Sequence, residues 1–340
     1  MGELASMELL VRGVAVGALL GLALCFGRAD AARLRLSGIL FCLSAAGHVL
    51  TQSPTVRLAS GAAFPVFWVL SITCAGFLWA FATDLFSDEA RTWRRFAPAA
   101  ATLLLAFAGL MARPPLAQGL WVIYSIVACA LIGHALYVVA RSWRDDLVES
   151  RRRVRGPVLV GAAAYGLVVV VFEATQMLWR PLPELAPVGA AALLMLSLSG
   201  MAVFLNADSN LLQSAPRPSP TRRSAGDRAL LARLTQAMDE ENVWRTEGLT
   251  MFDLAKQVGA PEHRLRRLIN TELGYRNFSA YLNERRINAA KAALADPDRA
   301  FSPVSGVAYE VGFASLGPFN RAFKAATGLT PSDWRAQALV

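Results

Sequence analysis

One short stretch in the C-terminal third is rich in side chains that bind anions and nucleic-acid bases. It contains His263, Arg264, Arg266, Arg267 and Asn270. Arginine and asparagine form paired hydrogen bonds with base edges when a helix carries them into the major groove of DNA. Leu265, Leu268 and Ile269 recur at helical spacing, so they form one apolar face and leave the polar side chains around it.

The elements around this stretch predict a helix-turn-helix. Residues 249–259 form a short predicted helix that Thr250 can cap and that ends at Gly259. A second helix over 261–273 follows after one residue, and Pro261 suits its first turn. Two helices joined by a tight turn, the second rich in arginine and asparagine, are typical of DNA-binding modules.

The pattern repeats further along the chain. Residues 303–311 are apolar at helical spacing and end at Gly312, and a second candidate recognition helix covers 315–327. A long helix over 277–294 lies between the two modules and carries Arg285, Arg286 and Lys291. Two modules on one rigid connector can enter successive major-groove segments about one turn apart.

Residues 230–336 resemble the DNA-binding domain of the AraC/XylS family of bacterial transcription regulators. The resemblance rests on two runs: Leu265-Arg266-Arg267-Leu268, Gly274, Tyr281-Leu282-Asn283, Arg286-Ile287 and Ala290; and Gly312-Phe313, Phe319-Asn320-Arg321-Ala322-Phe323-Lys324 and Gly328-Leu329-Thr330-Pro331-Ser332-Asp333-Trp334-Arg335. It implies that the recognition helices read bases. The first would offer His263, Arg264, Arg266 and Arg267 to the groove, with Asn270 near the DNA backbone.

The second recognition helix departs from the family pattern. Leu316, Gly317 and Pro318 stand where the family often has polar residues, and they cannot form paired bonds to base edges, although Leu316 can touch a thymine methyl group. Asn320, Arg321 and Lys324 suit phosphate or limited base contact. We therefore expect sequence specificity to come mainly from the first module.

The N-terminal part has the composition of a membrane protein. Of the 340 residues, 55% are hydrophobic and 17% are charged, against about 25% charged in soluble domains. The long apolar runs lie within residues 1–213. They predict seven membrane-spanning helices, at 7–27, 34–53, 60–83, 96–112, 117–140, 157–179 and 186–206.

The arginines of the connecting segments predict the orientation. Segments 28–35, 84–95 and 141–156 carry three, three and six arginines, whereas the alternate segments carry one each. Because basic residues stay on the cytoplasmic side, the N-terminus is expected outside and the C-terminus inside a bacterial cytoplasmic membrane.

Four polar side chains within the predicted spans are candidate sensor residues, because burying such groups in lipid is unfavourable. His48 and Gln52 share one helical face, and Glu173 and Gln176 share another. With the orientation above, all four lie in the outer half of the bilayer, where they can form a pocket open to the outside. The alternative is that they only bond to neighbouring helices.

The sequence therefore predicts an all-α protein with three parts: a membrane domain (1–206), a flexible linker (207–226) and a double helix-turn-helix domain (227–340). The four cysteines form no metal-binding or disulfide pattern, and no catalytic motif is evident, so neither an enzyme nor a cofactor or metal is expected. Double-stranded DNA and the lipid bilayer are the expected partners. A homodimer and a small-molecule ligand are further candidates, and the resemblance implies RNA polymerase.

The function predicted is that of a membrane-bound, sequence-specific transcription regulator that couples an extracytoplasmic or intramembrane signal to promoter binding. Two alternatives remain for the membrane half, a passive anchor and a module resembling a solute or ion transporter. A transporter does not explain the attached DNA-binding domain, and the passive anchor stays open.

Overall fold

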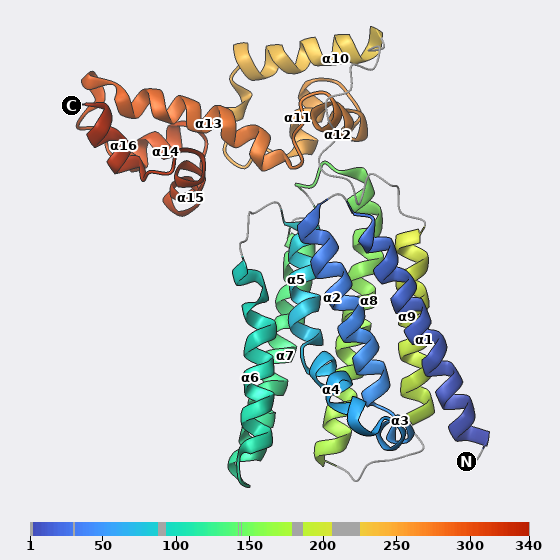
Figure 1. Cartoon of the computed structure of the whole chain (residues 1–340). Coiled ribbons are helices and arrows are strands. Elements are labelled where there is room, and N and C mark those ends of the chain that lie inside the picture. Colours follow the sequence, from blue (N-terminus) through green and yellow to red (C-terminus); the bar gives the residue numbers. More distant parts are fainter. Residues whose placement is uncertain are drawn as a thin grey trace. The chain divides into compact units, whose positions relative to one another are not determined.

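The computed structural model describes residues 3–29, 31–87, 93–141, 143, 145–178, 186–205 and 225–339, but not the side chains of 3–5, 150, 167–178 and 186. These residues are helical, with no strand among them. The chain divides into two compact units (Figure 1). The first unit comprises 1–143 and 150–214, and the second comprises 144–149 and 215–340.

Each of the seven apolar stretches is helical in the first unit. The helices are α1 (Glu3–Gly27), α2 (Ala32–Thr51), α3 (Pro54–Ala59), α4 (Phe64–Ile72), α5 (Cys74–Phe86), α6 (Ala97–Met111), α7 (Leu116–Arg141), α8 (Glu149–Leu178) and α9 (Ala186–Leu205). The long helices run along a common direction, and α3 lies across one end of this bundle (Figure 1). Within the described residues, five helices are long and apolar enough to cross a membrane, or six if one bent pair counts as a span.

The bent pair lies in the predicted third span, which is not one continuous helix. Segments Gly61–Ile72 and Cys74–Phe86 meet at an angle of 45°. At the break, the Thr73 hydroxyl donates to the carbonyl oxygens of Val69 (3.1 Å) and Leu70 (3.0 Å). A side chain that bonds to the preceding turn competes with the helical ladder and favours such a bend.

The surface of the first unit is apolar in a way that suits lipid. Leu24, Leu104 and Val160 are each at least 70% exposed, on three different helices. A soluble surface rarely carries a large contiguous apolar area. Inside the bundle, the rings of Phe26, Phe81 and Phe204 meet edge to face with centroids 5.0 to 5.9 Å apart.

The second unit places two helix pairs at the two ends of a connector helix (Figure 1). The first helix pair is α11 (Met251–Gln257) and α12 (Glu262–Thr271), and the second helix pair is α14 (Val304–Glu310) and α15 (Leu316–Thr327). The connector is α13 (Phe278–Ala295). Two further helices, α10 (Ala225–Thr235) and α16 (Pro331–Ala338), pack beside the first and second ends. The predicted linker 207–226 lies almost entirely outside the described residues.

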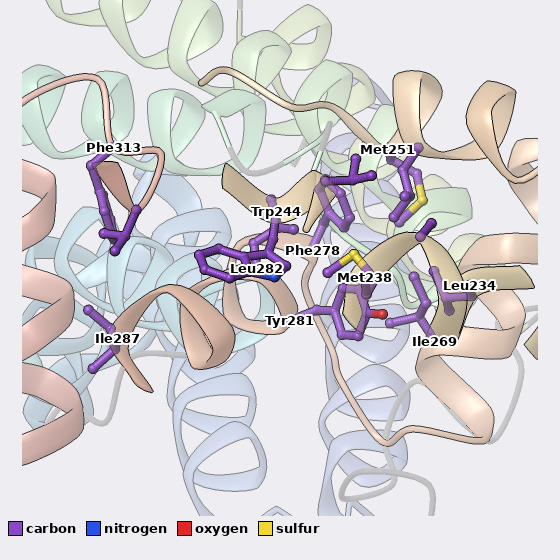
Figure 2. Close-up of a cluster of buried hydrophobic side chains, with 14 of the residues drawn as sticks. Leu234, Met238, Trp244, Met251, Ile269, Phe278, Tyr281, Leu282, Ile287 and Phe313 are labelled. Carbon is purple, nitrogen blue, oxygen red and sulfur yellow. The ribbon is translucent and has the colours of Figure 1, made fainter. Parts of the chain in front are cut away.

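One continuous apolar core holds both helix pairs. Figure 2 shows Met238 and Ile269 near the first pair, and Ile287 and Phe313 near the second, in the same cluster of buried side chains. Trp244 and Leu282 lie between these groups in the view. The two pairs therefore share a single core rather than forming two independent ones.

Polar contacts reinforce the junction between the pairs. Arg286 binds the backbone at the short helix Val243–Arg245 and at the residue after it. Its Nε donates to Trp244 O at 2.7 Å, and its Nη2 donates to Thr246 O at 2.9 Å. The same guanidinium lies 5.4 Å from the ring centre of Phe313. Burial lowers the pKa of Arg286 from its ordinary value, and the two carbonyls and the ring supply the compensating contacts.

Gly312 closes this junction from the other side. Its φ is +86°, and a Cβ atom placed there would lie 2.6 Å from Arg245 O. Both the left-handed backbone and the close approach of another backbone require glycine.

A segment from between α7 and α8 also belongs to the second unit, and we call it the 145–149 segment. Asp146 forms an isolated antiparallel bridge with Asn277, and Leu147 is 2% exposed within the common core. The Leu147 amide donates to Arg276 O at 3.0 Å, and the Phe278 amide donates to Asp145 O at 2.8 Å. Backbone bonds on both sides of the bridge therefore attach this segment to the start of α13.

Candidate nucleic-acid interface

Local capping interactions fix the first helix pair. Thr250 caps α11 in a reciprocal arrangement, in which the Asp253 amide donates to Thr250 Oγ1 at 3.2 Å and the Thr250 amide donates to the Asp253 carboxylate at 3.1 Å. The Thr250 hydroxyl also donates to the Asp253 carboxylate at 2.5 Å, and this bond, followed by the bond from the Thr250 amide, lowers the pKa of Asp253. Gly259, with φ +63°, makes the turn, and Pro261 precedes α12. The apolar face of α12 is then packed into the core through Leu265, Leu268 and Ile269.

The outer face of α12 carries three of the five predicted contact residues. His263 and Arg267 are exposed, and Arg264 is half-buried. Arg264 and Arg267 flank the carboxylate of Asp227 at the start of α10, with N–O distances of 3.1 and 3.7 Å. The outer face of α12 therefore presents cations that one acidic side chain partly neutralises.

Arg266 and Asn270 are buried instead of exposed. Arg266 is 7% exposed, and its Nη1 donates to Asp146 O at 2.9 Å while its Nε donates to Glu262 at 2.9 Å. Asn270 is 8% exposed and donates to Tyr275 O at 2.9 Å, which closes the turn after α12. In this structure both side chains therefore have protein partners, and neither is exposed at the surface of α12.

The predicted contact residues of α15 all lie at the surface. Leu316 is 38% exposed, and Asn320, Arg321 and Lys324 are exposed. The opposite face buries Phe319 and Phe323 completely. Gly328, with φ +79°, ends the helix in a left-handed C-cap. The result is a helix anchored by aromatic side chains, whose outer face is polar and basic.

The candidate sensor residues are only partly described. His48 Nδ1 lies 3.1 Å from Ser71 Oγ, which accepts a further bond from the Thr51 hydroxyl at 3.0 Å. The His48 ring meets Tyr165 edge to face at 5.7 Å. Gln52 offers its backbone oxygen to Arg12 at 3.4 Å. The side chains of Glu173 and Gln176 lie outside the described residues.

A buried ion pair next to His48 was not singled out from the sequence. Arg12 is 2% exposed, and it donates to the Glu8 carboxylate at 2.8 Å and to Val49 O at 2.6 Å. Arg12 thus connects α1 to α2. The sequence could have indicated this pair, because Glu8 and Arg12 are charged residues four apart within an apolar stretch. Charged residues inside a predicted span are candidate functional residues.

The described cavity in the first unit has a different character from the polar pocket that we expected. Its volume is about 380 Å³, and its walls are mainly apolar, with Leu22, Phe41, Phe81, Val158 and Leu193 among them. Tyr165 and Ser197 are polar exceptions. Neither His48 nor Gln52 lines it, although Tyr165 connects the cavity wall to His48. Among the described residues, no cluster of histidine, cysteine or carboxylate side chains is arranged to hold a metal ion.

Comparison with known proteins gives the class to which the second unit is similar. Residues 254–337 match the family described as a helix-turn-helix domain, an AraC-type module. This range takes in most of α11 and all of α12 to α15.

A curated relative agrees with this class. The chain is 43% identical to the transcriptional activator RhrA of Rhizobium meliloti (strain 1021) over 61 residues, which are 18% of this chain and 19% of that protein. The chain thus matches about a fifth of the length of this relative. No solved structure matches the chain.

Proposed function

We propose that this protein is a membrane-bound, sequence-specific DNA-binding transcription regulator and not an enzyme. The observation that carries the proposal is the pair of recognition faces on α12 and α15. On both helices the apolar side is packed into one core, while basic and amide side chains occupy the outer side. A helix that enters the major groove needs this division.

The two faces are proposed to have unequal roles. His263, Arg264 and Arg267 on α12 would contact base edges, because arginine is the commonest partner of guanine. Asn320, Arg321 and Lys324 on α15 would contact mainly phosphates, with Leu316 against a thymine methyl group. Arg266 and Asn270 would reach DNA only after a rearrangement, since both have protein partners here.

A binding-site selection tests this function. Full-length protein in lipid nanodiscs is incubated with random duplex DNA, and the bound fraction is sequenced over several rounds. A defined motif covering two neighbouring major-groove segments is expected. Enrichment of no motif, with binding that follows only salt concentration, would show non-specific charge attraction and overturn the proposal.

The first unit is proposed to span the bacterial cytoplasmic membrane seven times, with the N-terminus outside. The long apolar helices support membrane insertion, and the arginine-rich segments support the orientation. Residues 1–206 would form this domain, 207–226 a flexible linker and 227–340 the DNA-binding domain. Labelling of single introduced cysteines from each side of intact cells tests the orientation. Reaction of an Ala225→Cys variant with an impermeant reagent from outside would refute it.

A sensing role for the membrane domain is favoured by the apolar cavity and the adjacent Arg12–His48 polar cluster. An apolar molecule that partitions into the membrane suits the mainly apolar walls. His48→Ala should then change target-gene output across growth conditions without changing DNA affinity. Leu24→Ala, at a lipid-exposed position, is the control. A passive anchor predicts unchanged output for both variants, and a transporter predicts solute flux across vesicles.

A further inference from the structure

The 145–149 segment contacts the second unit through backbone bonds, a buried side chain and a side-chain contact to α13. The backbone bonds are those between Leu147 and Arg276 and between Phe278 and Asp145. The Asp145 carboxylate also accepts from the Ser279 hydroxyl at 2.9 Å. Asp146 is 3% exposed and Leu147 2%, so the segment is an integral part of the fold of this unit.

The position of this segment concerns DNA recognition directly. Asp146 O accepts from Arg266 Nη1 at 2.9 Å, so the segment holds one of the arginines of the recognition helix. The bridge at Asn277 also lies in the turn that joins α12 to the connector α13. The same five residues therefore restrain both the recognition helix and the start of the connector.

The chain links this segment to the first unit over a very short distance. Helix α7 ends at Arg141, and α8 begins at Glu149. Four residue steps separate Arg141 from Asp145, and they span at most about 14 Å when fully extended. A displacement of the end of α7 by more than this slack must pull on the segment, whereas α8 continues directly from its last residue, Glu149.

We propose that the 145–149 segment is a latch through which the α7–α8 connection controls the DNA-binding unit. In the docked state it holds Nη1 of Arg266, and its release frees this part of the guanidinium for DNA and loosens the turn before α13. The effect on DNA rests on the proposed function, whereas the docking itself does not.

A disulfide across the bridge tests the docking. The amides and carbonyls that bond are those of the flanking residues, so Asp146 and Asn277 form a non-hydrogen-bonded antiparallel pair. Such pairs have Cα atoms about 4.5 Å apart, which a disulfide can span. The Asp146→Cys/Asn277→Cys protein, full-length in nanodiscs, should therefore form an internal disulfide under mild oxidation.

The control pair is Asp146→Cys/Lys324→Cys, in which the second position is exposed on α15. The disulfide-linked peptides are identified by mass spectrometry, which separates them from any product of the four native cysteines. Equal yields for the two pairs, or no disulfide at Asp146 and Asn277, would overturn the docking.

DNA affinity of the same protein then tests the latch. The oxidised protein should bind its target about fivefold or more weakly than the reduced protein, because one arginine contact is withheld. Wild-type protein, treated identically, should show no difference. Equal affinity of the oxidised and reduced pair variant would exclude the latch. If the disulfide forms but wild-type protein selects no DNA motif, the proposed function fails and the docking stands.

The Asn277 side chain caps α13 by accepting from the Ala280 amide at 2.7 Å, so a second variant keeps the test valid if its loss disturbs folding. Leu147→Ser removes the apolar anchor of the segment and should raise DNA affinity several-fold, with faster amide exchange around Phe278. Leu339→Ser, at an exposed leucine, should change neither quantity. Unchanged or reduced affinity for Leu147→Ser would also contradict the latch.

Discussion

Asp227 accepts a hydrogen bond from Arg264 at 3.1 Å, which places a carboxylate from the first turn of α10 on the outer face of the recognition helix. The same oxygen lies 3.7 Å from Arg267. DNA phosphates would compete with this carboxylate for both arginines.

Asp227→Asn should therefore strengthen DNA binding. Partly exposed ion pairs are worth about 0.2–1 kcal/mol, so we expect roughly a two- to fivefold gain in affinity at low salt. The dependence of affinity on salt concentration should also become steeper. Fluorescence anisotropy with labelled duplex measures both. Glu247→Gln removes an exposed charge elsewhere in the unit, and an equal gain there would assign the effect to net charge alone.

Arg267→Ala should weaken and broaden DNA recognition without unfolding the domain. The side chain is 64% exposed, so its removal leaves the core intact. Loss of a paired contact to a base costs about 1–3 kcal/mol and relaxes selectivity at that base pair. A binding-site selection with the variant measures this. Arg228→Ala, on the exposed surface of α10, should keep the wild-type motif.

Lys324→Ala provides the complementary case. A phosphate contact should be lost equally on all sequences, with the salt slope reduced by about one. A change of motif for Lys324→Ala, or none for Arg267→Ala, would reverse the roles proposed for α15 and α12.

Gly312→Ala should destabilise the second unit. The left-handed backbone alone costs roughly 1–2 kcal/mol for an alanine, and the added Cβ would meet Arg245 O at 2.6 Å. Gly306→Ala is the matched control, because Gly306 lies in α14 and a methyl group there would meet nothing within 4 Å. That substitution should stabilise the helix by about 1 kcal/mol. Urea unfolding followed by circular dichroism measures the free energy of unfolding of both variants. Similar changes in this free energy for Gly312→Ala and Gly306→Ala would contradict the need for glycine at the junction.

Removal of Arg12 alone should destabilise the first unit more than removal of the whole ion pair. Arg12→Met leaves the Glu8 carboxylate buried without its partner, which typically costs about 3–5 kcal/mol. The double variant Glu8→Gln/Arg12→Met should recover part of that loss. Thermal unfolding in detergent compares the stabilities of the wild type, the single variant and the double variant. A double variant less stable than Arg12→Met would show that the pair itself is not the reason.

Alkaline pH should weaken the second unit through Tyr275. Burial and then a hydrogen bond to Glu284 raise its pKa to about 12, so the folded state favours the neutral phenol. In the unfolded chain the phenol ionises near pH 10. The stabilisation is therefore complete below about pH 10 and is lost as the pH rises toward 12.

Tyr275→Phe should make the free energy of unfolding less dependent on pH in this range, and urea titrations at several pH values measure it. Tyr309→Phe, at an exposed tyrosine, should retain the wild-type dependence. If the free energy of unfolding falls with pH equally steeply for Tyr275→Phe and for the wild type, Tyr275 is not the cause of the alkaline destabilisation.

The helices could be predicted because their boundaries are encoded locally. Thr250, Gly259 and Gly312 act through their own backbone or cap, so a short stretch of sequence reveals them. Apolar periodicity located the core faces of α12 and α15 for the same reason. The bend at Thr73 was missed because a threonine in an apolar run does not by itself distinguish a bent span from a straight one.

The orientation of Arg266 and Asn270 could not be predicted in this way. Periodicity finds the apolar stripe of α12, but it does not show which other segments cover the polar residues beside that stripe. The partner of Arg266 is Asp146, which is 120 positions away in the sequence. Asp227 was missed for a similar reason, because its proximity to Arg264 and Arg267 exists only after α10 packs on α12.

Because the two helix pairs share a single core, the distance and the angle between α12 and α15 are fixed within the second unit. Arg286 and Gly312 join the pairs without a flexible hinge between them. Each inserted base pair would rotate one contacted segment against the other by about 35° and move it by about 3.4 Å. Under the proposed function, the unit would therefore select the spacing between two contacted DNA segments as well as their bases.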